Sequence, residues 1–222
     1  MPRWESVARE QINSGLKKIS KALAALEERD AVEADTRLLV TDVLCDLLGF
    51  DKYEELTAEY SVKGEFADFG IRIDRQMSAF VEIKRVAQKL NPTHLRQVET
   101  YCLKQGVQWA ILTNARHWQV YNVQAAPGEQ AETNLVLEVD LLDPQTKPKE
   151  KVESLLPISR VGFTRGLIDA AWKQRYVSSP KALGPVVLSK SVIDEIRKEL
   201  WRQQKVKVDT TVIRASVEKM IS

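Results

Sequence analysis

The sequence has few of the residues that mark specialised protein classes. Its 222 residues include only 2 cysteines, Cys45 and Cys102, and both fall on the apolar stripe of a predicted helix. No second Cys or His stands at ligand spacing from either of them, so we expect buried thiols and not metal-binding or nucleophilic ones. With 44% hydrophobic and 29% charged residues, the composition is that of an ordinary globular protein with a substantial core.

Long apolar runs and a phosphate-binding loop are also missing. No stretch approaches the length that spans a bilayer, and the first residues lead into a charged helix without an apolar signal region. We therefore expect a cytoplasmic protein that does not enter a membrane. The pattern GxxxxGK[ST] does not occur, which predicts that the protein uses no nucleotide cofactor and has no ATPase of its own. The net charge is only +2, so any nucleic-acid surface must come from local clustering of basic residues.

Two segments between residues 66 and 84 alternate in polarity with the period of a β-strand. Phe69, Ile71 and Ile73 form the apolar set of the first segment, and Val81 and Ile83 form that of the second. If both sets face the same side of a hairpin, odd-numbered residues pair with odd-numbered residues. This register predicts a connection of three or five residues rather than a tight two-residue turn.

The same register predicts that Asp68, Glu82 and Lys84 share one face near a strand end. Two carboxylates and the backbone carbonyl of Ile83 offer the hard oxygen ligands that Mg²⁺ prefers, with water and phosphate oxygens completing its coordination. Lys84 would then orient or help to deprotonate an attacking water and offset charge on the phosphoryl group. This layout favours hydrolysis of a phosphodiester.

These residues resemble the PD-(D/E)xK nucleases. The resemblance rests on Asp68 in Ala-Asp-Phe-Gly-Ile, on Glu82 and Lys84 in Val-Glu-Ile-Lys-Arg, and on a following helix with Gln97 and Tyr101 in a QxxxY motif. The segment from about 31 to 123 looks like the N-terminal nuclease domain of the restriction subunit of type I restriction enzymes. Ala67 replaces the proline of the family name. The resemblance implies a restriction-endonuclease-like α/β core, Mg²⁺ or Mn²⁺ as cofactor, and DNA as substrate.

The resemblance also implies supporting roles for residues outside the strand pair. Gln97 would hydrogen-bond a metal-bound water or the Glu82 carboxylate, and Tyr101 would donate to a phosphate oxygen. Glu33, on the first core helix, would help to hold the metal or its waters. The alternative for Glu33 is that it only complements the positive end of that helix.

Basic residues near the proposed site are candidates for contact with nucleic acid. Arg37 lies one helical turn beyond Glu33, so it would contact phosphate or pair with Glu33 itself. Arg85, Lys89 and Arg96 follow the ExK strand. His94 is predicted to be an exposed helix residue rather than a ligand.

We divide the chain into three parts. Residues 1–30 form an N-terminal helix with a heptad-like apolar stripe, which either lies on its own domain or serves as a dimerisation arm. Residues 31–143 form the nuclease-like core, a mixed sheet of five or six strands with helices on its faces. Residues 144–222 form a helical appendage, with helices expected at about 149–156, 164–176 and 190–203, the last preceded by Gly184-Pro185, and a final helix after residue 209. Many basic residues alternate with acidic ones in this part, which predicts either a salt-bridged helix surface or an appendage that grips DNA or binds a partner.

The favoured function is therefore Mg²⁺-dependent cleavage of nucleic acid, as a DNA endonuclease of restriction, defence or repair. The first alternative is a nucleic-acid-binding or protein-interaction module that keeps the nuclease fold without turnover. A second is a structural protein in which Asp68 and Glu82 simply pair with Lys84 and Arg85.

Overall fold

The computed structural model describes residues 2–62, 64–125 and 131–221. Contacts between residues divide the chain into two compact units, which meet between Asp169 and Ala170. This division lies further along the chain than residue 143, where the sequence-based boundary was placed. The first unit includes the N-terminal helix together with the sheet.

The first unit contains the whole sheet, and the second is helical. The elements of the first unit are α1 (Arg3–Glu28), α2 (Glu33–Asp42), the π-helical segment η1 (Val43–Leu47), β1 (Leu56–Val62), β2 (Glu65–Ile73), β3 (Gln76–Ile83), α3 (Pro92–Gln105), β4 (Trp109–Thr113), β5 (His117–Gln124), β6 (Glu132–Asp140), α4 (Pro148–Leu155), the 3-10 segment η2 (Leu156–Ile158) and α5 (Arg160–Thr164). Helix α6 (Leu167–Val177) crosses the division, and α7 (Pro180–Val187), α8 (Lys190–Gln204) and α9 (Thr210–Ile221) follow.

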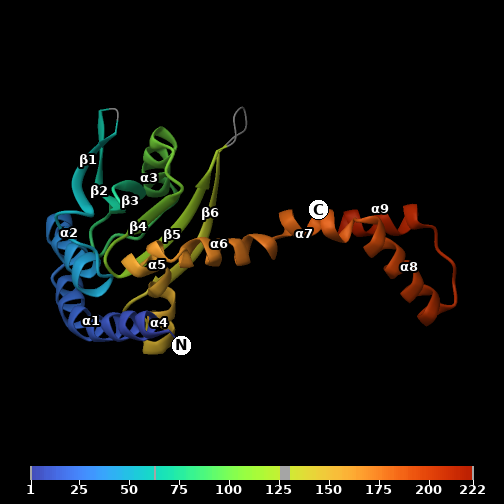
Figure 1. Cartoon of the computed structure of the whole chain (residues 1–222), viewed down its shortest axis with the longest axis horizontal. Coiled ribbons are helices and arrows are strands. Elements are labelled where there is room, and N and C mark those ends of the chain that lie inside the picture. Colours follow the sequence, from blue (N-terminus) through green and yellow to red (C-terminus); the bar gives the residue numbers. More distant parts are fainter. Residues whose placement is uncertain (1, 63, 126–130, 222) are drawn as a thin grey trace. The chain divides into compact units, whose positions relative to one another are not determined.

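The sheet has six strands in the order β1-β2-β3-β4-β5-β6 (Figure 1). Only β3 and β4 run parallel, and the other neighbouring strands are antiparallel. Helix α3 makes the crossover that a parallel pair requires, because its residues lie between β3 and β4 in the chain. The prediction of an α/β fold with a mixed sheet and flanking helices is confirmed.

The β2–β3 hairpin has the predicted parity but a different turn. Phe69 pairs with Val81 and Ile71 pairs with Ala79, so odd residues face odd residues along this part of the ladder. The turn, however, is the two-residue Asp74-Arg75, with φ values of 51° and 66°. A β-bulge between the Ile71 and Arg72 pairings absorbs the difference of one residue. The predicted loop of three or five residues is therefore wrong, since the bulge preserves the register that the loop was meant to secure.

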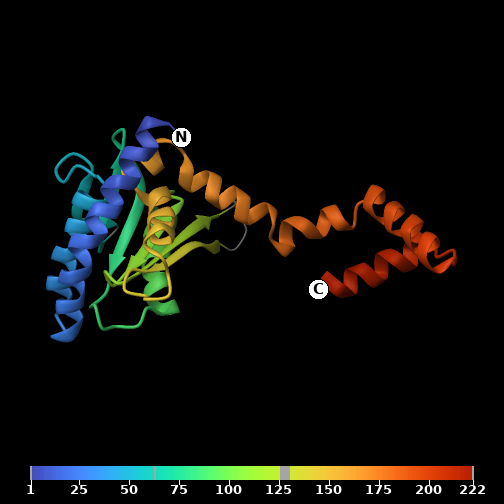
Figure 2. The same cartoon turned by 90° about the horizontal axis from the view of Figure 1, so that it is seen from below.

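Helix α1 packs on its own unit. Its stripe residues Ile12, Leu16, Ile19 and Leu23 are all buried, and the helix contacts α2, η1 and α4. Figures 1 and 2 both show α1 alongside α2 and η1. The stripe is thus covered within the chain, as in the first of the two predicted alternatives, and is not exposed as a dimerisation seam.

Helix α3 begins and ends where the sequence predicts. The Asn91 side chain accepts hydrogen bonds from the backbone N–H groups of Thr93 and His94, Pro92 occupies the first turn, and Gly106 ends the helix with φ 67°. Val98 and Cys102 on this helix are fully buried in a core cluster with Phe80. This packing fixes α3 against β3 and β4.

The second unit contains one helix that the sequence analysis missed. Residues 180–187 form α7, which includes Gly184 and Pro185, a pair interpreted above as lying outside a helix. Only Ile193 and Ile213 are buried among the described residues of this unit. Within the described ranges of the whole chain, none of the helices combines the length and hydropathy of a bilayer-spanning segment.

Candidate active site

Asp68 and Glu82 lie next to each other where β2 and β3 separate. Phe69 and Val81 form the outermost pair of their ladder, and beyond it the Asp68 carboxylate accepts the Ile83 backbone N–H, with 2.7 Å between Oδ2 and N. A side chain thus replaces the backbone partner that Ile83 would otherwise have on β2, while on its other side Ile83 pairs with Thr113 of β4. Both carboxylates are buried, with 8% of Asp68 and 2% of Glu82 exposed.

The two oxygens of Glu82 have different surroundings. Oε1 accepts a hydrogen bond from the Lys84 ammonium at 2.6 Å, whereas Oε2 is buried without a partner in the described part of the protein. Burial raises the pKa of Glu82 to about 7; the Lys84 hydrogen bond acts against this shift, and Asp68 and Glu33 add to it. A buried oxygen without a partner costs about 1–3 kcal/mol, which a cation placed there would recover.

Lys84 connects the strand pair to α3. Its backbone N–H donates to Thr113 O at 2.8 Å, which fixes the residue just beyond the end of β3. Besides Glu82, its ammonium donates to Gln97 Oε1 at 3.3 Å. The predicted grouping of Glu82, Lys84 and Gln97 is therefore present, although Gln97 contacts the lysine and not the glutamate.

Tyr101 links the same network to β2. Gln97 Nε2 donates to the Tyr101 hydroxyl at 3.0 Å, and that hydroxyl donates to the backbone carbonyl of Phe66 at 2.9 Å. The Tyr101 ring is 2% exposed and packs edge to face on Phe80. The sequence predicted that the Tyr101 hydroxyl would donate to a phosphate oxygen. In the structure, its proton is instead donated to the Phe66 carbonyl. Tyr101 holds the strand that carries Asp68.

Arg37 is the counter-ion of Asp68. Its Nη2 donates to Asp68 Oδ1, and its Nη1 donates to Glu59 Oε1 at 3.4 Å. From the sequence, the predicted partner of Arg37 was a phosphate or Glu33. The structure instead pairs it with the buried Asp68, since α2 packs against β3 and sequence spacing gave no sign of that contact.

Glu33 is the first residue of α2 and is half-buried. Its charge adds to the rise in the pKa of Glu82 and opposes the lowering of the pKa of His94. Across the described residues, however, no three His, Cys, Asp or Glu side chains are grouped closely enough to hold a metal ion. The predicted ligand set of Asp68, Glu82, Glu33 and the Ile83 carbonyl stays a prediction.

The remaining basic candidates lie at the surface. Arg85 donates to Asp30 Oδ2 at 3.1 Å, so it does not pair with Asp68 or Glu82 as the structural alternative required. Lys89 and Arg96 are exposed to solvent. None of these contacts tests their predicted role in nucleic-acid binding.

His94 was predicted to be exposed, and this is wrong. It is only 9% exposed, and its Nε2 lies 3.1 Å from Gln88 Nε2 and 3.2 Å from Asn91 Nδ2. Its Nδ1 is buried and has no partner in the described part of the chain. Burial lowers the pKa of His94, the Lys84 ammonium lowers it further, and Glu33 opposes them. The signal was present in the sequence, because the third residue after an Asn N-cap folds back towards that cap.

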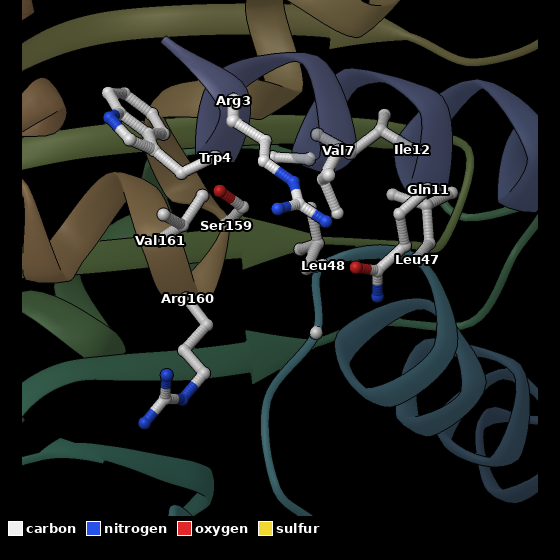
Figure 3. A pocket seen from close by; sticks show the side chains of 12 residues that line it. Arg3, Trp4, Val7, Gln11, Ile12, Leu47, Leu48, Ser159, Arg160 and Val161 are labelled. Atoms are coloured by element: carbon white, nitrogen blue, oxygen red, sulfur yellow. The ribbon is translucent and has the colours of Figure 1, made fainter.

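A separate cavity of about 470 Å³ lies between α1, the end of η1 and the start of α5. Figure 3 shows the Arg3 side chain reaching into it from α1, whereas the side chains of Trp4 and Arg160 extend away from it. The Arg160 guanidinium donates to both oxygens of Glu55. None of the residues that line this cavity belongs to the predicted site.

The six-stranded mixed sheet, the Asp68 and Glu82-x-Lys84 strands and the Gln97-Tyr101 helix together define a PD-(D/E)xK nuclease-like domain. Residues 33–136, just under half of the chain, match the family of the type I restriction enzyme R protein N terminus. The match includes every predicted site residue. Neither the curated proteins nor the solved structures gave a match to the chain.

Proposed function

We propose that this protein is a cytoplasmic, Mg²⁺-dependent DNA endonuclease of the restriction or defence type. The observation that carries the proposal is the buried Glu82, which has one oxygen on Lys84 and one oxygen without a partner. Asp68 lies beside it. A nuclease-type role agrees with the family of residues 33–136.

The residues fit a divalent cation through their charge and their open oxygen. A buried carboxylate with a pKa near 7 gains when a cation is placed beside it, because the cation favours the ionised form. Asp68, Glu82, the Ile83 carbonyl and Glu33 would hold Mg²⁺, or Mn²⁺ in its place. The cation would polarise the phosphate and lower the pKa of a water.

The protein side chains would do the remaining work. Lys84 donates to Glu82 in the structure, and its ammonium would turn towards the attacking water or the phosphoryl oxygens once Glu82 is neutralised by a cation. Gln97 accepts from Lys84 and would limit how far the ammonium moves. The hydrogen bond from the Tyr101 hydroxyl to the Phe66 carbonyl would fix the position of β2 relative to α3, and with it the position of Asp68.

Cleavage of circular and linear DNA by the purified chain, with Mg²⁺ or Mn²⁺ against EDTA, tests this proposal. Lys84→Ala should lower the rate by about 100-fold or more, as expected when a group that stabilises developing charge is removed. The fold should persist, because Glu82 can take up a proton when its lysine is lost. Lys52→Ala is the matched control, since Lys52 is an exposed lysine outside the site.

A second function is favoured by one specific observation. Asp68 is already bonded to Arg37 and to the Ile83 N–H, which is the arrangement expected of a nuclease fold kept for binding without turnover. In that case calorimetric titration with Mg²⁺ would give the same heat for the wild type and for Glu82→Gln. DNA would be bound but not cut. Metal binding that is lost in Glu82→Gln would exclude this second function.

A further inference from the structure

The second unit has a net positive charge, whereas the rest of the chain has a net negative one. Residues 170–222 hold 11 Lys and Arg against 5 Asp and Glu, a net charge of +6, whereas the remainder has a net charge of −4. The overall value of +2 therefore hides two parts of opposite sign. A basic part of this kind attracts polyanions, and the contrast matters because the net charge of the whole chain gave no such signal.

The positive charge gathers around a half-exposed tryptophan at the end of α8. A cavity of about 530 Å³ is lined by Arg197, Lys198, Trp201, Arg202, Lys207 and Val208. The Trp201 side chain is 48% exposed, and the Lys205 ammonium lies 5.1 Å from the centre of its ring. The Trp201 indole is thus a large apolar surface that is exposed to solvent and has basic side chains around it.

The left-handed backbone conformation at the end of α8 places Lys205 next to the Trp201 indole. Lys205 follows the last helical residue with φ 58°, and its N–H donates to Trp201 O at 3.0 Å. A left-handed conformation is unfavourable for a residue other than glycine. Attraction to the negative end of the helix accounts for Arg202 and Lys205. It does not account for Lys207, which lies beyond the helix, or for an exposed indole.

Carboxylates on α8 pair with three of these cations, and Arg197 lies 3.4 Å from Asp194. Arg202 pairs with Glu199 at 2.8 Å and Lys198 pairs with Glu195 at 2.9 Å, both three residues apart on the exposed helix. Such solvent-exposed pairs contribute little to stability, so a phosphate can replace the carboxylate.

We propose that Arg197, Trp201, Arg202, Lys205 and Lys207 form a binding site for single-stranded nucleic acid. An unpaired base stacks on the exposed part of the Trp201 indole, while the cations contact the flanking phosphates. A duplex keeps its bases stacked on one another and cannot use the indole in this way. A membrane surface would require a broad apolar helix face, whereas four cations line this cavity.

Binding to a labelled oligothymidine of about 15 nucleotides tests the proposal by fluorescence anisotropy, with the full chain and over a series of salt concentrations. EDTA is present throughout, so that the result does not depend on the proposed nuclease activity. Trp201→Ala should raise Kd about tenfold without changing the salt dependence. Lys205→Gln/Lys207→Gln should reduce the slope of log K against log salt by about 1.4, because each phosphate contact on a single strand contributes about 0.7.

Two matched controls and one conservative variant accompany these changes. Tyr53→Ala removes another exposed aromatic beside a lysine, and Lys17→Gln/Lys18→Gln removes the same charge from α1, where both lysines are exposed. Neither should alter Kd or the salt slope. Trp201→Phe keeps a stacking surface and should retain most of the affinity, which separates lost stacking from lost structure.

Three results would each overturn the proposal. The first is an unchanged Kd in Trp201→Ala. The second is tighter binding of the equivalent duplex, with no dependence on Trp201. The third is binding to vesicles of anionic lipid that the same substitutions abolish, with no binding of the oligothymidine.

Discussion

Replacing Glu82 with glutamine should change how the stability of this protein depends on pH. Burial raises the pKa of the Glu82 carboxyl from 4.5 to about 7 in the folded protein, in spite of the Lys84 hydrogen bond. The folded state therefore holds a proton that the unfolded state releases at lower pH. The stability that this proton contributes is fully present below the unfolded pKa of 4.5 and is lost as the pH rises through about 7.

The size of this effect follows from the difference between the two pKa values. One pKa unit corresponds to about 1.4 kcal/mol, so the shift of Glu82 corresponds to about 3 kcal/mol at most. Glutamine has the shape of the protonated acid but does not titrate, so the free energy of unfolding of Glu82→Gln should lack this decline. In the wild type, Mg²⁺ added at high pH should recover stability, because it favours the ionised carboxylate.

Urea unfolding of both proteins from about pH 5 to about pH 8 in EDTA measures this difference. His94 has a lowered pKa, so its contribution increases stability as the pH rises. That contribution is common to both proteins and cancels when their curves are subtracted. Parallel curves for wild type and Glu82→Gln would refute the reasoning, since they would mean that Glu82 titrates at its ordinary pKa.

The other predictions concern the residues that hold the two carboxylates. Arg37→Met removes the cation that competes for Asp68 Oδ1, so Mg²⁺ should bind about tenfold more tightly in a calorimetric titration; equal or weaker binding would show that Arg37 does not compete. Tyr101→Phe removes the hydrogen bond to the Phe66 carbonyl and should lower the free energy of unfolding by about 1 kcal/mol, as well as the cleavage rate. Urea unfolding and a cleavage assay measure the two effects. An unchanged free energy of unfolding together with an unchanged cleavage rate would show that the Tyr101 hydroxyl does not fix the position of β2.

The strand elements of the site could be predicted from the sequence because their signals are local. Alternation of apolar and polar residues fixed the shared face of Asp68 and Glu82, and the Asn91-Pro92 start and Gly106 end fixed α3. The turn was predicted wrongly because Asp74-Arg75 lacks the usual glycine and a bulge compensates for its length. A bulge leaves no mark in the periodicity of the sequence.

The contacts of Arg37 and His94 could not be predicted in the same way. The contact of Arg37 depends on how α2 packs against the sheet, and that of His94 depends on how α3 packs against it. The pattern of residues along a single helix gives no information about this packing. Helix α7 was missed because Gly184 and Pro185 usually end helices. The grouping of cations around Trp201 could not be predicted because the alternation of basic and acidic residues in this part also fits an ordinary salt-bridged helix surface.

The central claim is that Asp68, Glu82 and Lys84 cut DNA with a divalent cation. Incubation of circular DNA with the wild type, Lys84→Ala and Lys52→Ala, each with Mg²⁺ or EDTA, tests it most directly. The account predicts that the wild type and Lys52→Ala open the circles only with the metal, and that Lys84→Ala does not open them. Equal cleavage by Lys84→Ala, or cleavage that persists in EDTA, would contradict the account.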